Sequence, residues 1–100
     1  MTDNSKLLDP INDAIMGNDR FIEHKAADAV KSAERLAEMI KGILEDAGRT
    51  DPETITRSLS EVVRGYAGQL ETCHEHVIAA RMENSGLRWA RGIIENGGEF

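Results

Sequence analysis

The fold is decided by residues 22–47, which read IEHKAADAVKSAERLAEMIKGILEDA. Apolar residues recur there in alternating steps of four and three positions, which places them on one side of an α-helix. This first seam consists of Ile22, Ala26, Ala29, Ala33, Leu36, Ile40, Ile43 and Ala47. Charged residues occupy most of the positions between them. The stretch therefore predicts one long amphipathic helix over residues 19–47, which needs a partner for its apolar side.

A second long helix is expected over residues 52–83. Its residues at helical spacing form a second seam, made of Ile55, Leu59, Val62, Tyr66, Leu70, Cys73, Val77 and Ala80, with Val63 beside it. The segment before it, residues 48–53, has the composition of a turn. Gly48 suits a helix C-cap, Thr50-x-x-Glu53 has the pattern of a capping box, and Asp51 is an alternative cap. Because this connection is short, the two long helices should pack antiparallel.

Shorter helices are expected at both ends of the chain. Asp9 followed by Pro10 is typical of a helix start, and Gly17 suits a C-cap, which predicts a helix over residues 10–16. Asn18 or Asp19 would then cap the long helix.

Asn84-Ser85-Gly86 is a cluster of helix-breaking residues. At 100° per residue, the later apolar residues are rotated by about 80° from the second seam. This predicts a bend or a new helix over residues 87–96, which Gly97-Gly98 would end.

Together these elements predict a single all-α domain over residues 1–100, with flexible ends at 1–8 and 97–100. The expected architecture is an antiparallel helical hairpin with short flanking helices, completed to a bundle by dimerisation, because two helices cannot enclose their own seam. The residues expected to be left open in a lone hairpin, and therefore to drive self-association, are Leu36, Ile40, Ile43, Leu59, Val63 and Tyr66.

The charge and composition argue against several classes of function. The chain has 18 acidic and 12 basic residues, a net charge of −6, and no basic block, so we expect no nucleic-acid ligand. No apolar run approaches the roughly 20 residues of a membrane span. The N-terminal residues lack the pattern of a signal peptide. The one cysteine, Cys73, excludes an internal disulfide, and we expect a cytoplasmic protein.

The segment over residues 71–76 is the one that carries metal-ligand chemistry. Glu71 and His74 have the i, i+3 spacing that di-iron carboxylate bundles use. Cys73 and His76 have the same spacing, which can bind zinc or copper. However, the first seam offers no inward carboxylate that could complete such a site. The main interpretation is that Cys73 is a core residue and the histidines lie at the surface. A ferritin-like or other metal-binding bundle remains the alternative.

The remaining candidates point to protein binding. Trp89, near Arg81, Arg88 and Arg91, is either a plug for the core or an anchor in a partner, because Trp and Arg are favoured at interface hot spots. The acidic side of residues 19–47, with Glu34 and Glu38, would suit a basic partner surface.

No catalytic constellation or phosphate-binding loop is present, so we expect neither an enzyme nor a cofactor. The chain is similar in class to small acidic helical antiactivators, adaptors, secretion chaperones and phage-type inhibitors. The leading hypothesis is a dimeric regulatory protein that occupies another protein. The Trp-x-Gly turn of helical-hairpin secretion substrates is absent.

Overall fold

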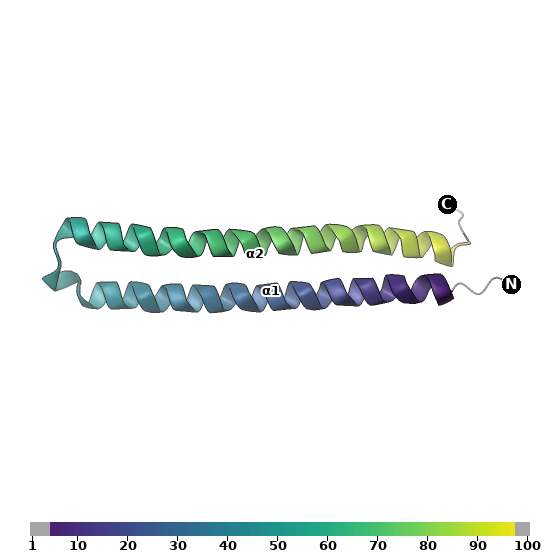
Figure 1. Ribbon diagram of the computed structural model, residues 1–100, viewed down its shortest axis with the longest axis horizontal. Helices are drawn as coiled ribbons and strands as arrows, with labels where there is room; N and C mark the ends of the chain where they lie inside the picture. The colour runs from purple at the N-terminus through teal and green to yellow at the C-terminus, as the bar shows by residue number, and fades with distance from the viewer. Residues whose placement is uncertain (1–4, 98–100) are drawn as a thin grey trace. The chain divides into compact units, whose positions relative to one another are not determined.

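The computed structural model describes residues 5–97, which form two long α-helices and a short 3-10 helix (Figure 1). Helix α1 spans Ser5–Glu45, η1 spans Ala47–Arg49, and α2 spans Pro52–Glu95. The two α-helices pack against each other through contacts such as Asn18 to Asn84 and Ser32 to Gln69, and residues 5–97 contain no strand. Over residues 5–97, neither α1 nor α2 contains an apolar stretch that could span a lipid bilayer. The all-α prediction is therefore confirmed. The predicted flexible ends fall partly on residues 1–4 and 98–100, which lie outside the described residues.

The predicted helix boundary at residues 16–19 is wrong, because α1 is continuous from Ser5 to Glu45. Pro10 lies inside the helix, where it lacks the N–H that would bond to the carbonyl of Lys6. Gly17 has no positive φ and costs only about 1 kcal/mol in a helix interior. The inward residues Ile15 and Ile22 continue the same face across Gly17, so packing overrides this weak local signal.

The predicted break at residues 84–87 is also wrong, because α2 is continuous to Glu95. Asn84 is 2% exposed and lies on the inward face, four residues after Ala80 and three before Leu87. The second seam thus continues with a mean repeat close to 3.5 residues. Counting 100° per residue along such a repeat adds an error of about 20° for every seven residues. This error accounts for much of the rotation that the sequence pattern indicated between the second seam and the later apolar residues.

The turn between the helices uses Asp51 as its cap, as the alternative prediction had it. The backbone N–H of Thr54 donates to Oδ2 of Asp51 over 3.0 Å, and its hydroxyl donates to Oδ1 over 2.7 Å. These two bonds hold the pKa of Asp51 below its ordinary value. The Thr50 capping box is wrong, because the Thr50 hydroxyl donates to the carbonyl of Asp46 instead.

The C-caps of the two long helices differ from each other. Gly48 is not the C-cap of α1: it lies within η1 and has no positive φ. Gly97, with a φ of 69°, follows the end of α2, as predicted.

The packing divides into two units. The terminal unit comprises residues 1–25 and 76–100, and the turn unit comprises residues 26–75. In the terminal unit, Ile15 and Ala80 are buried between the two helices. Contacts there join Asn12 to Arg91, Asn18 to Asn84, and Phe21 to His76, so the two segments run in opposite directions.

In the turn unit, the residues of α1 that face α2 differ from those of the predicted first seam. Ser32 is buried, and its hydroxyl donates to Oε1 of Gln69 over 3.2 Å. Ala26 and Ala33 are exposed, so their assignment to the buried seam is wrong. The inward face of α1 instead passes through Ala29, Ser32 and Leu36, which are three and four positions apart. Ser32 therefore takes the place that the first seam gave to Ala33. The turn-unit residues of the second seam, from Ile55 to Cys73, are half-buried as predicted.

Candidate functional site

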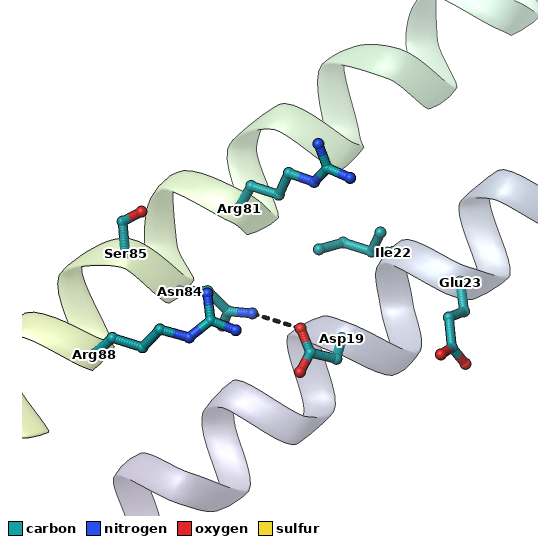
Figure 2. A pocket seen from close by; sticks show the side chains of 7 residues that line it. All are labelled: Asp19, Ile22, Glu23, Arg81, Asn84, Ser85 and Arg88. Atoms are coloured by element: carbon teal, nitrogen blue, oxygen red, sulfur yellow. Dashed lines mark hydrogen bonds between the residues drawn. The ribbon is translucent and has the colours of Figure 1, made fainter.

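A cluster of polar side chains lies at the centre of the terminal unit, around Asn84 of α2 (Figure 2). Nδ2 of Asn18 donates to Oδ1 of Asn84 over 2.9 Å. Nδ2 of Asn84 donates to Oδ1 of Asp19 over 2.9 Å and reaches the carbonyl of Ile15 at 3.5 Å. Among the described residues, no buried side-chain nitrogen or oxygen lacks a partner. The cluster therefore satisfies the polar groups that it buries.

A pocket of about 460 Å³ opens beside this cluster. Its lining comes from both helices of the terminal unit: Asp19, Ile22 and Glu23 from α1, and Arg81, Asn84, Ser85 and Arg88 from α2. Figure 2 shows Arg81 and Arg88 on either side of Asn84 along α2. The pocket thus combines two guanidinium groups with two carboxylates. The pocket therefore presents both signs of charge.

Trp89 lies on the outward side of α2 and is 64% exposed. Met82, seven residues earlier, is 70% exposed, and Ile78 is also exposed. At 100° per residue, Trp89 and Met82 lie roughly 140–160° around the helix from the inward Asn84. Trp89 is therefore not a plug for the core of this unit. We call Ile78, Met82 and Trp89 the outer face of α2.

The three arginines near Trp89 differ in their surroundings. Arg81 and Arg88 are exposed and line the pocket. Arg91 is half-buried: its Nη1 donates to Oδ1 of Asn12 over 3.0 Å, and its Nε lies 3.9 Å from Oε1 of Glu95. Arg91 therefore joins α1 to α2, whereas Arg81 and Arg88 remain accessible for contacts with another molecule.

The candidate metal ligands do not converge. Glu71 and His74 are exposed, and Cys73 is half-buried on the inward face of α2. The ring of His76 packs against that of Phe21, with centroids 6.0 Å apart and an interplanar angle of 45°. Within residues 5–97, no group of three or more His, Cys, Asp or Glu side chains is placed to hold a metal ion.

The other candidates lie in the turn unit. Glu34 and Glu38 are exposed on α1. Of the residues predicted to drive self-association, only Val63 is exposed; Leu36, Ile40, Ile43, Leu59 and Tyr66 are half-buried. Val63 therefore faces outward, while the others lie on or beside the face where the helices meet.

Sequence reasoning missed the polar residues of the inward faces, namely Asn18, Ser32 and Asn84. Each lies three or four positions from an inward apolar neighbour, and this spacing was the signal that could have identified them. The sequence pattern predicts a cap at Asn18 and a breaker at Asn84, because asparagine side chains also favour those positions, and it assigns no role to Ser32. A comparison with protein-family models, curated proteins and solved structures finds no match to this chain.

Proposed function

We propose that this chain is a cytoplasmic protein-binding module that folds as a helical hairpin, forms a homodimer and acts by occupying a partner protein. The observation that carries the proposal is the outer face of α2. Three large apolar side chains, Ile78, Met82 and Trp89, are exposed there on the side of the helix away from Asn84. Exposed apolar groups gathered on one helix face are typical of helices that bind in a groove of another protein.

The neighbouring charges indicate the chemistry of the partner. Arg81 and Arg88 are exposed on the flank of α2 between the inward Asn84 and the outer face. Tryptophan and arginine supply a large share of the binding energy at protein interfaces. The proposed partner is therefore a protein with an apolar groove and acidic residues at its rim. This role requires no catalytic group.

The experiment compares three tagged proteins as baits in an extract of the native cell. They are the unmodified chain, Met82→Ala with Trp89→Ala, and the control Arg57→Ala with Glu61→Ala, which alters exposed positions in the turn unit. The partner should be retained by the unmodified chain and by the control, but not by the outer-face variant. Circular dichroism checks that all three proteins remain helical.

Titration of the purified partner then gives the decisive measurement. Loss of a hot-spot tryptophan should weaken binding by roughly 30-fold, which corresponds to about 2 kcal/mol. Equal affinity of the partner for the unmodified chain and the outer-face variant would show that α2 does not bind through this face.

A further inference from the structure

Helix α1 carries a second apolar stripe in the turn unit, beside its inward face. The residues of this α1 stripe are Ala26, Val30, Ala33, Ala37, Ile40 and Leu44, at steps of four and three. Val30 is 57% exposed and Leu44 is 59% exposed. The three alanines are also exposed, and Ile40 is half-buried. The stripe thus has the spacing of a helix–helix seam, and most of it is not covered by α2.

The chain exposes more surface than a compact monomer of its mass. Its accessible surface is 7501 Å², whereas a compact folded monomer of this mass exposes about 5,600 Å². The difference of about 1,900 Å² exceeds the roughly 800 Å² that each partner buries in a standard interface. Burial of an apolar stripe is the most favourable use of such area.

We propose that the α1 stripe, over its part from Ala33 to Leu44, binds the same part of the α1 stripe of a second copy of this chain, antiparallel, around a two-fold axis. The inference deepens the homodimer of the proposed function by naming its surface and register. In this register, Ala33 meets Leu44 of the second copy, and Ala37 meets Ile40. The two-fold axis repeats each contact in reverse, so every central layer places a small side chain against a large one. This alternation fills the interface without voids.

Charge complementarity selects this orientation. Glu34 and Lys41 each lie one residue beyond an apolar stripe residue, on the same flank, and both are exposed. In the antiparallel register, Glu34 of each copy lies beside Lys41 of the other, which gives two opposite-charge pairs. In a parallel, in-register pair, Leu44 would meet Leu44 and Ala33 would meet Ala33. In that parallel pair, Glu34 and Lys41 would face the opposite flank of the second copy's α1. That flank carries Ala29, Leu36 and Ile43 and offers no charge to either residue.

Sedimentation equilibrium of Leu44→Glu tests the surface. The unmodified chain should be a dimer, and Leu44→Glu should be monomeric and still helical. A full chain that is monomeric at every concentration would overturn both the homodimer and this inference. A dimer with the same dissociation constant in the Leu44→Glu variant would overturn the α1 stripe alone. Partner binding through the outer face of α2 is measured separately, so the two failures are distinguishable.

Charge exchange tests the register. Glu34→Lys and Lys41→Glu should each raise the dimer dissociation constant by roughly tenfold, because each replaces two attractive pairs by two repulsive ones. An equimolar mixture of the two variants should recover affinity, since the heterodimer restores opposite charges on both flanks. Glu38→Lys and Lys31→Glu make the same charge changes at exposed positions off the stripe, and should have no such effect alone or mixed. A mixture that does not recover would overturn the antiparallel register.

Discussion

Nδ2 of Asn84 donates a 2.9 Å hydrogen bond across the terminal unit to Oδ1 of Asp19, from a residue that is only 2% exposed. Oδ1 of Asn84 accepts a second bond of equal length from Asn18. A buried asparagine in a helix–helix seam lowers stability relative to an apolar residue but disfavours other registers, in which its amide would lose its partners. The hydrogen bonds to Asn18 and Asp19 therefore explain why Asn84, which the sequence pattern reads as a helix breaker, lies inside a continuous helix.

We expect Asn84→Ala to lower the free energy of unfolding by about 1–3 kcal/mol, because it removes the hydrogen bonds that the buried amide makes to Asn18, Asp19 and Ile15 of α1. Urea denaturation measures this change. Ser85→Ala, at the exposed neighbouring position, is the control and should change stability little. A neutral Asn84→Ala variant would contradict the arrangement around Asn84.

Gly17→Ala should raise the free energy of unfolding, by up to about 1 kcal/mol, because alanine is the better residue in a helix interior. A Cβ placed at Gly17 meets no atom within 4 Å. Gly97 has a φ of 69°, so Gly97→Ala should have the opposite sign. Thermal or urea denaturation of the two variants compares them directly. If Gly17→Ala were destabilising, the chain would end a helix at that residue.

The cap at Asp51 predicts a dependence of stability on pH. Its pKa is lower in the folded chain than in the unfolded one, because the carboxylate accepts two bonds from Thr54. The unfolded chain therefore binds the proton more tightly, so this contribution is complete above the unfolded pKa and is lost as the pH falls through the folded pKa.

Asp51→Ala should accordingly be less stable than the unmodified chain at neutral pH, and the gap should narrow as the pH falls below about 4. Asp51→Asn keeps an acceptor that does not titrate, so its stability should lack this pH dependence. The measurement is the midpoint of thermal unfolding as a function of pH. A gap that stays constant down to acidic pH would rule out the capping carboxylate as its cause.

Chelation of divalent metal ions should leave the thermal midpoint unchanged, because Glu71, Cys73, His74 and His76 do not form a group that could hold a metal. The variant Glu71→Ala with His74→Ala should unfold at nearly the same temperature as the unmodified chain. Elemental analysis of the purified protein provides an independent measurement. Stoichiometric zinc or iron that disappears in the variant would revive the metal-binding alternative.

Much of the fold followed from spacing alone. The seam from Ile55 to Ala80 predicted the inward face of α2 because apolar residues at helical spacing must be buried together. Pro52 and Asp51 indicate the start of α2, because the first N–H groups of a helix have no partner within it: proline lacks such an N–H, and the Asp51 carboxylate accepts a bond from another. These signals depend on residues that are close together in the sequence, so they can be recognised from the sequence alone.

The candidate site was less predictable. Trp89 stood out by its residue type, but its position on the outward side of α2 depended on the continuity of the helix through Asn84. Arg91 was grouped with Arg81 and Arg88 by proximity in the sequence. Its bond to Asn12 joins residues far apart in the chain, and no local pattern indicates such a contact.

The sequence by itself determined that the chain is helical and where the turn lies, because helix spacing and the Asp51 cap are local properties. Only the tertiary structure decided that α1 and α2 run unbroken through Gly17 and Asn84. Local propensities at those residues are worth about 1 kcal/mol, and they are outweighed by packing and by hydrogen bonds to the other helix. The partner of a polar side chain such as Asn84 is decided by which residue lies opposite it, and that requires both helices.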